Sequence, residues 1–197
     1  MIRATSIVML LAALLAACDR APAPSPEASS TSETIGPSIY PLATPLRDQD
    51  GHVIALDTFR GHPVIVSMFY ASCPSACPLT ISRIQAIERE LTPAEQADLR
   101  VLLVSFDREH DTPAVLREAA DSHHVDERWK LTSASTDDAR ALAAALGVTY
   151  TKRPEGGFSH NSVLMLLDRD GRTVARVEGA TTDTSAIVHA LSARDRS

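Results

Sequence analysis

Residues 63–80 read PVIVSMFYASCPSACPLT, a stretch in which an apolar run leads directly into a pair of cysteines. The opening run is continuous and rich in β-branched residues, which is typical of a strand covered on both faces of a sheet. A helical pattern begins at Pro78 and keeps one apolar stripe as far as Leu91. We therefore expect Cys73 and Cys77 to lie where a buried strand gives way to a helix.

Strand and helix patterns continue on both sides of this stretch. A hairpin is expected over 46–56 around an Asp-Gly turn, and a second buried strand over 100–106. Capping and stop signals predict helices at residues 112–123, 136–146 and 183–193. Another turn signal predicts a second hairpin, with strands at 163–167 and 173–177. This order predicts an α/β, thioredoxin-like fold with a central mixed sheet flanked by helices and an added N-terminal β-hairpin.

The spacing of Cys73 and Cys77 is suited to metal binding and to disulfide formation. Two side chains four residues apart share one helical face, so they can hold a common ligand or close a disulfide. A helix N-terminus lowers the pKa of a thiol, and the thiolate is the form that binds soft metals and exchanges disulfides. The alternative is a disulfide that only stiffens the loop, although a three-residue spacer gives such a bridge little entropic benefit.

Composition excludes some classes of function. The chain has 197 residues with 25 acidic against 19 basic side chains, a net charge of -6 that leaves no basic face for nucleic acid. A hydrophobic content of 44% and a charged content of 22% suit one globular domain with additional segments. Three cysteines are too few for a disulfide framework, so their positions carry the information.

The N-terminus has the features of an export signal. Residues 1–17 combine one basic residue with a short apolar run that is too short to span a bilayer. The sequence LAAC at 15–18 resembles the lipobox of bacterial lipoproteins, which implies cleavage before Cys18 and lipidation of that cysteine. The alternative is an ordinary signal peptide with an incidental cysteine. Asp19 resembles the signal that keeps some lipoproteins in the inner membrane, so we expect a lipid-anchored protein on the periplasmic side of that membrane.

Residues 18–39 contain the lipidated cysteine and a stretch rich in Pro, Ser and Thr with little to bury, which predicts a flexible tether. About 20 such residues have an r.m.s. reach of roughly 25 Å. The remaining segment, 40–197, has the size of a single domain.

Four ordered motifs lie in this segment. They are Cys-Pro-x-x-Cys-Pro at 73–78, Ser-x-Asp-x-x-x-Asp-Thr-Pro at 105–113, Trp-x-Leu-Thr at 129–132, and a histidine ahead of Leu-x-Asp-x-x-Gly within 158–171. With them, the segment resembles the SCO/SenC family of copper-handling, thioredoxin-like proteins attached to the bacterial cytoplasmic or mitochondrial inner membrane. Two positions depart from the family pattern: Arg108 replaces a usual Pro, and Asn161 precedes Ser162 where Ser usually follows the histidine directly. Neither departure removes a donor atom.

The resemblance implies that Cys73, Cys77 and His160 bind copper. Two thiolates and one imidazole form a soft donor set suited to Cu(I), and an added ligand allows Cu(II). Structural zinc needs a fourth protein ligand, and none is evident. Asp107 resembles a family acid near the copper site that orients a ligand or contacts a partner, while a turn-capping role is the alternative. The remaining histidines show no partner spacing and are expected at surface or turn positions: His52, His62, His110, His123, His124 and His189.

The function implied is that of a membrane-anchored periplasmic copper metallochaperone. Its expected partners are cytochrome c oxidase subunit II, or another periplasmic copper protein, and a thiol reductant that keeps the cysteine pair reduced. One alternative is a thiol-disulfide oxidoreductase that uses Cys73 and Cys77 to reduce its client without carrying copper. Another is a redox or copper sensor. Enzymatic activity is therefore left open by the sequence.

Overall fold

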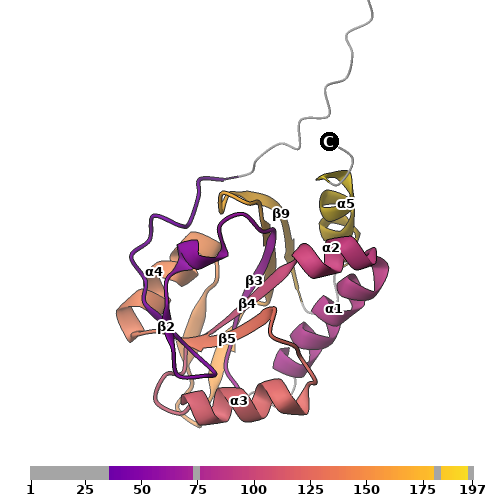
Figure 1. The fold of residues 1–197 in the computed structure, drawn as a ribbon. Coiled ribbons are helices and arrows are strands. Elements are labelled where there is room, and N and C mark those ends of the chain that lie inside the picture. Colours follow the sequence, from indigo (N-terminus) through magenta and orange to yellow (C-terminus); the bar gives the residue numbers. More distant parts are fainter. Residues whose placement is uncertain (1–35, 73–75, 180–182, 195–197) are drawn as a thin grey trace, which may run out of the picture. The chain divides into compact units, whose positions relative to one another are not determined.

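The computed structural model describes residues 36–72, 76–179 and 183–194. Its main strands are β1 (Leu46–Asp48), β2 (Val53–Ile54), β3 (Val64–Phe69), β4 (Arg100–Ser105), β5 (Trp129–Ser133), β8 (Val163–Leu167) and β9 (Thr173–Glu178). Within the described residues they form a seven-stranded sheet in the order β2-β1-β5-β4-β3-β8-β9 (Figure 1). The strands β3, β4 and β5 run parallel, whereas β8, β9, β1 and β2 pair antiparallel. The predicted mixed sheet, thioredoxin-like order and N-terminal hairpin are confirmed.

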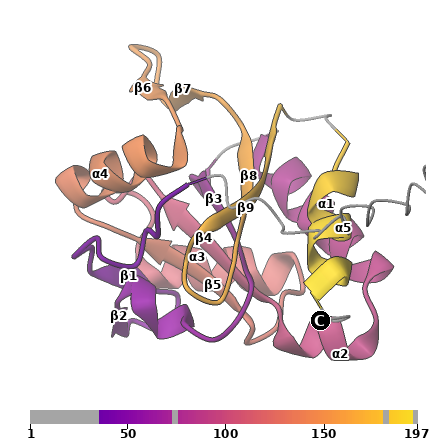
Figure 2. The ribbon, with the colours of Figure 1, turned by 90° about the horizontal axis from the view of Figure 1, so that it is seen from above.

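Helices and a small separate hairpin surround this sheet. The helices are α1 (Ala76–Glu90), α2 (Pro93–Asp98), α3 (Pro113–Ser122), α4 (Thr136–Leu146) and α5 (Ser185–Arg194), with a 3-10 turn η1 (Leu56–Phe59). The hairpin consists of β6 (Tyr150–Lys152) and β7 (Phe158–His160). Figure 2 shows α4 beside this hairpin and away from α1 and α5.

The predicted elements form where the capping signals place them. Thr112 accepts a hydrogen bond from the Val115 amide at the start of α3, and Gly147 ends α4 in the left-handed conformation. Helix α1 begins at Ala76, two residues before the predicted start at Pro78. Proline is tolerated there because the first-turn amides of a helix have no intrahelical acceptor.

Several observed elements are not among those predicted from the sequence. Helix α2 is short and polar, and it is held by a capping box in which Thr92 and Glu95 bond to each other's backbone amides. Strand β5 is stabilised by contacts with residues distant in the sequence. The buried side chain of Gln49 donates to the Trp129 carbonyl (3.0 Å) and accepts from the Leu131 amide (3.0 Å). The hairpin β6–β7 is likewise short and mostly exposed.

The packed part of the chain begins slightly before Tyr40. Ile39 is 4% exposed, its amide donates to the Gly171 carbonyl (3.0 Å), and Ser38 bridges Arg172. The predicted signal peptide, the predicted lipidation site Cys18 and most of the predicted tether lie outside the described residues.

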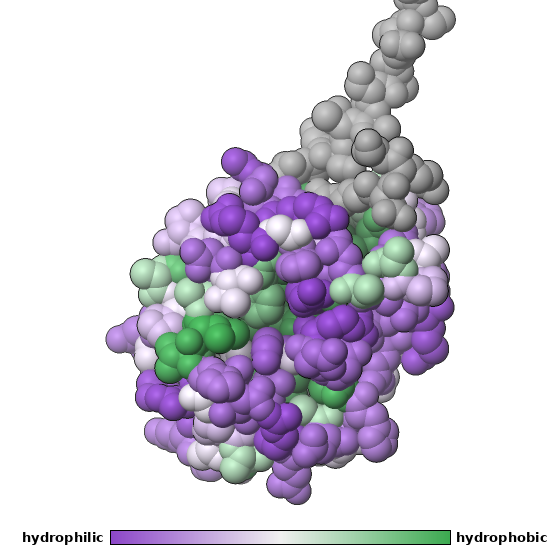
Figure 3. All heavy atoms as spheres, in the orientation of Figure 1, coloured by the Kyte–Doolittle hydropathy of each residue, from purple (hydrophilic) through white to green (hydrophobic). Residues whose placement is uncertain are grey.

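The surface drawn in Figure 3 is largely hydrophilic, with separate hydrophobic areas. Large apolar side chains that are exposed among the described residues are Val53, Leu79 and Val115. None of the helices described is long and apolar enough to cross a bilayer.

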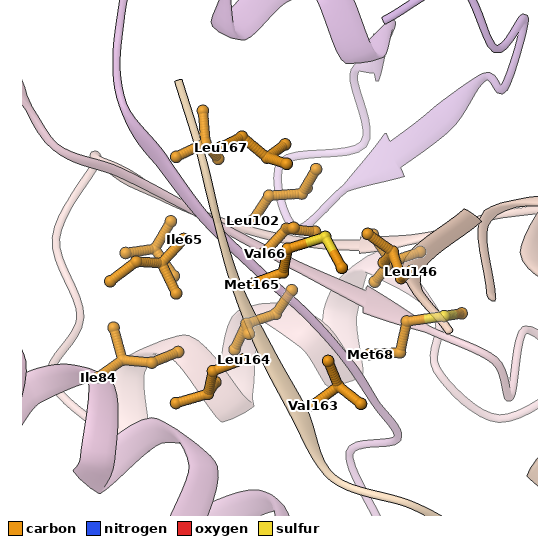
Figure 4. Close-up of a cluster of buried hydrophobic side chains, with 14 of the residues drawn as sticks. Ile65, Val66, Met68, Ile84, Leu102, Leu146, Val163, Leu164, Met165 and Leu167 are labelled. Atoms are coloured by element: carbon orange, nitrogen blue, oxygen red, sulfur yellow. The ribbon is translucent and has the colours of Figure 1, made fainter. Parts of the chain in front are cut away.

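The core lies on both faces of β3. Alternate side chains of a strand point to opposite faces of its sheet, so Ile65 and Met68 face different helices. Figure 4 shows Ile84 of α1 near Ile65, and Leu146 of α4 near Met68. All four side chains are buried. The continuous apolar run of β3 is therefore explained by helices on both of its faces, which fix the strand end that precedes the cysteines.

Candidate metal centre

The segments that lead to Cys73 and to Asp107 lie where two parallel strands end. The carboxyl ends of β3 and β4 lie at one edge of the sheet, which is where α/β folds commonly bind ligands. Tyr70–Ser72 continue from β3 toward the first cysteine, and Phe106 continues from β4 toward Asp107. The Phe106 amide donates to the Phe69 carbonyl (3.1 Å), so the two segments stay paired beyond the strands. The fold thus places two of the sequence motifs side by side.

Of the predicted cysteine pair, only Cys77 is described, at the start of α1. Cys73 lies outside the described residues, and Cys18 does too. The backbone of Cys77 belongs to the first turn of α1, while its side chain is outside what the structure describes. First-turn amides and the helix dipole stabilise a thiolate at such a position and lower its pKa. The shared role of the two sulfur atoms stays a prediction.

A buried carboxylate fixes the segment that enters the cysteine loop. Asp111 is 1% exposed, and its Oδ2 accepts hydrogen bonds from the Ala71 amide (2.8 Å) and the Ser105 hydroxyl (2.5 Å). The same hydroxyl oxygen accepts from the Asp107 amide (2.9 Å). Burial raises the pKa of the Asp111 carboxyl, although the bonds from Ser105 and Ala71 act against that rise. Asp111 therefore ties the end of β3 to the end of β4.

His160 is held with one ring nitrogen available. Its Nδ1 lies 3.0 Å from the Asn161 carbonyl oxygen. Because a carbonyl can only accept, Nδ1 carries a proton, so Nε2 is the ring nitrogen whose lone pair can bind a metal. The ring packs edge-on against Tyr70 (centroids 6.0 Å apart) and obliquely against Phe106 (5.3 Å). A ring oriented by a backbone acceptor, with Nε2 free, is the arrangement usual for a metal-binding histidine.

Aromatic side chains form the packing around this ring. Tyr70 lies 5.3 Å from Phe158 and 5.4 Å from Phe106, and Phe106 stacks on Tyr150 at 4.7 Å. Gly157 has a φ of +70°, and a Cβ there would approach the Tyr70 hydroxyl to 3.3 Å. The β6–β7 loop therefore passes close to the end of β3. Because Tyr70 immediately precedes the cysteine loop, this packing brings His160 to the start of that loop.

Asp107 takes part in a turn, as in the turn-capping alternative, and its carboxylate makes a further contact that the sequence does not predict. It is 7% exposed, and both carboxylate oxygens accept from His110 Nδ1 (2.9 and 3.0 Å). The hydrogen bond to Asp107, and then its charge, raise the pKa of His110. The backbone carbonyl of Asp107 also accepts hydrogen bonds from the amides of His110 and Asp111, as in a capped turn. His110 lies at the exposed turn position expected for it, and the turn after β4 brings its ring to the Asp107 carboxylate, a pairing that its spacing in the sequence does not indicate.

Other possible ligand atoms gather at two places in the described residues. Asp48, Asp50 and His52 form one group, and Asp107, Glu109 and His110 form the other. Lys130 lies 3.5 Å from both carboxylates of the first group, and Lys152 lies 3.3 Å from Glu109 in the second. Because neither group contains a thiolate, neither is the soft donor set that Cu(I) prefers, so neither competes with the predicted donor set for Cu(I).

Sequence reasoning missed the residues that position the site. Asp111 lies within the motif at 105–113, but the motif indicates no role for it. The sequence also does not connect the four aromatic side chains with His160. The signal for Asp111 is an acid flanked by a helix cap, which is also the pattern of an ordinary turn. The aromatic residues come from three distant segments, so no local spacing links them.

Comparison with known proteins shows similarity in sequence to one family. The SCO1/SenC family model matches residues 44–194. The chain is 26% identical over 137 residues to the SCO1 protein homolog of Bacillus subtilis, covering 68% of this chain and 70% of that protein. It is 25% identical over 133 residues to an SCO2-like protein of Rickettsia prowazekii, covering 64% of this chain but only 63% of that protein.

Solved structures show the same fold. A SCO1/SenC family lipoprotein from Bacillus anthracis has a TM-score of 0.69 at 18% identity, covering 77% of this chain and 93% of that one. Copper-bound ScoI of Bradyrhizobium japonicum has a TM-score of 0.63 at 23% identity, covering 78% and 96%. BsSco, a Sco family cytochrome c oxidase assembly protein with a disulfide switch, has a TM-score of 0.66 at 21% identity, covering 82% and 98%.

Proposed function

The chain belongs to the SCO1/SenC family, and on that premise we propose that it is a membrane-anchored copper metallochaperone. In this proposal Cys73, Cys77 and His160 bind copper and deliver it to the dinuclear copper site of cytochrome c oxidase subunit II. Cys18 carries the lipid that holds the protein on the periplasmic side of the inner membrane. The copper-bound ScoI structure and the Sco family oxidase assembly protein support this assignment.

One observation carries the proposal for this chain. His160 donates through Nδ1 to the Asn161 carbonyl and keeps Nε2 for a metal, while Tyr70 and Phe106 hold the ring beside the segment that leads to Cys73. An imidazole oriented in this way adds a third donor to two thiolates, which together suit Cu(I). An ordinary surface histidine has no need of packing on two buried rings.

The proposed transfer is an exchange of ligands. Thiols of the client lose their protons as they bind Cu(I), and Cys73, Cys77 and His160 leave the metal one after another. The released thiolates of Cys73 and Cys77 regain protons, so copper keeps its oxidation state and no electron moves. If the pair is oxidised to a disulfide, a thiol reductant must supply two electrons and two protons before the protein can bind copper again.

A second candidate is thiol-disulfide exchange with the client. The observation that favours it is the place of Cys77 in the first turn of α1, where the helix N-terminus lowers the pKa of a thiol. The related BsSco is described by a disulfide switch, which fits this role. Here Cys73 and Cys77 would be oxidised as two client cysteines are reduced.

Substitution of His160 separates these two functions. We expect His160→Ala to weaken Cu(I) binding by at least about tenfold, because one of three donors is lost, and to leave the Cys73–Cys77 disulfide able to form and exchange. His189→Ala is the matched control, since His189 is exposed on α5. Competition titration with a Cu(I) chelator measures the affinity. Equal affinities for wild type and His160→Ala would overturn the ligand assignment.

The anchor has its own test. Mass spectrometry of the mature protein from membranes should find a diacylglycerol-modified Cys18 as the first residue. The lipoprotein relative from Bacillus anthracis supports this expectation. A mature N-terminus at another residue, without lipid, would contradict it.

A further inference from the structure

A cleft of about 380 Å³ opens next to the candidate metal centre. It lies between the turn after β4, the start of α4 and the β6–β7 hairpin. Its apolar lining comes from aromatic rings, and its polar lining includes basic side chains from each of these elements. The residues used in the argument are Phe106, Tyr150 and Phe158 for the rings and Arg108, Arg140 and Lys152 for the basic groups.

The cleft and the metal centre share a wall. Phe106 stacks on Tyr150, which lines the cleft, with a centroid distance of 4.7 Å and an angle of 11° between the rings. The same Phe106 ring lies 5.3 Å from the ring of His160. A segment seated in the cleft would therefore lie one aromatic ring away from a proposed copper ligand.

The basic groups around the cleft form only weak, exposed ion pairs or none among the described residues. Lys152 pairs with Glu109 at 3.3 Å and Arg140 with Asp137 at 3.3 Å, and all four side chains are more than half exposed. Exposed pairs of this kind contribute about 0–1 kcal/mol, so a partner's carboxylate can replace the acid at little cost. Arg108 is exposed and makes no ion pair with any residue that the structure describes.

The sign of this rim contrasts with the rest of the molecule. The chain as a whole carries a net charge of -6. Asp107 and Glu109 also line the cleft, but the three basic side chains leave its lining with a net positive charge of one. A local positive rim on an acidic protein favours a negatively charged occupant.

We propose that this cleft docks an extended acidic segment of the protein with which copper is exchanged, with Arg108 as its main charge contact. The inference rests on the proposed copper-transfer function and adds to it the docking surface and the charge of the partner. Complementary charges at such a rim act on the association rate and on the orientation of the complex. An acidic segment held there would present its metal ligands to His160.

The test measures binding between the full-length chain in detergent and the metal-free copper-binding domain of oxidase subunit II from the same organism. At about 50 mM salt, Arg108→Glu should weaken binding about tenfold and Arg108→Gln about threefold. The control is Arg89→Glu, which makes the same charge change at an exposed position on α1 away from the cleft. It should change binding by less than about twofold, and at about 500 mM salt the variants should converge because surface charges are screened.

Each outcome decides one of the two claims. Equal losses for Arg108→Glu and Arg89→Glu would show a long-range charge effect and overturn the docking cleft. Unchanged binding for both Arg108 variants, or no binding by wild type, would overturn it as well. Chelator titration of the same samples is the independent readout, because the proposed copper site should keep wild-type affinity in the Arg108 variants. Loss of Cu(I) binding by the wild type would instead overturn the proposed function.

Discussion

Removal of the Asp111 carboxylate should destabilise the strand end that leads to the cysteine loop. In Asp111→Ala the Ala71 amide and the Ser105 hydroxyl lose their shared acceptor, which lies at 2.8 and 2.5 Å. A buried donor left without a partner costs about 1–3 kcal/mol. Part of this loss is offset, because the other carboxylate oxygen is buried without a hydrogen-bond partner. We therefore expect Asp111→Ala to lower the free energy of unfolding by about 2–5 kcal/mol.

Asp111→Asn is the matched variant. Both hydrogen bonds end on the same oxygen, Oδ2, so an asparagine carbonyl in that place can still accept them. The expected loss is about 1 kcal/mol, because both hydrogen bonds are kept while the new amide NH2 takes the place of the buried oxygen that has no hydrogen-bond partner. Because burial raises the pKa of Asp111 in the folded state, its ionisation destabilises the native protein as pH rises above the unfolded-state pKa. The cost of Asp111→Asn should accordingly be smaller near about pH 7 than near about pH 4.

Urea unfolding at both pH values measures these differences, and hydrogen exchange of the Ala71 amide measures the local effect. Exchange at Ala71 should accelerate in Asp111→Ala and stay close to wild type in Asp111→Asn. Wild-type stability in the alanine variant, or equal losses in both variants, would refute the argument that Oδ2 acts as the shared acceptor.

Two further predictions use other contacts. Asp107→Asn should lower the pKa of His110 toward its ordinary value of about 6.5, as measured by NMR titration, and an unchanged pKa would contradict the observed pair. Gly171→Ala should cost more than about 2 kcal/mol, because its Cβ would approach the Tyr40 ring to 2.6–2.8 Å at a φ of +77°. Gly51→Ala, at a φ of +84° in open space, should cost only about 1 kcal/mol, and equal shifts of the two urea midpoints would disprove the steric argument.

The sequence predicts the elements whose burial pattern is local. The apolar run of β3 and the helix signals at Thr112 and Gly147 lead to the observed elements because strand burial and capping depend on neighbouring residues. Strand β5 escapes prediction because it reads WKLTS, without a continuous apolar run. Its buried Thr132 is accommodated by donating to the Leu103 carbonyl of the adjacent strand (3.1 Å). Such an element depends on tertiary pairing, which no window of the sequence contains.

The candidate site also contains residues that local sequence predicts and features that it does not. Cys73 and Cys77 can be singled out because their spacing and the strand before them are local. The orientation of His160 cannot be predicted in this way, because it depends on a backbone carbonyl and on rings from the segments that follow β3 and β4. A motif therefore indicates which donors belong to a site, while long-range packing decides which nitrogen faces it.

X-ray absorption spectroscopy at the copper edge, on the reduced full-length chain loaded with one Cu(I), tests the central claim most directly. The account predicts a first shell of two sulfur atoms and one imidazole nitrogen, and loss of the imidazole scattering in His160→Ala with both sulfur atoms retained. A first shell without sulfur, or an imidazole contribution unchanged in His160→Ala, would contradict it.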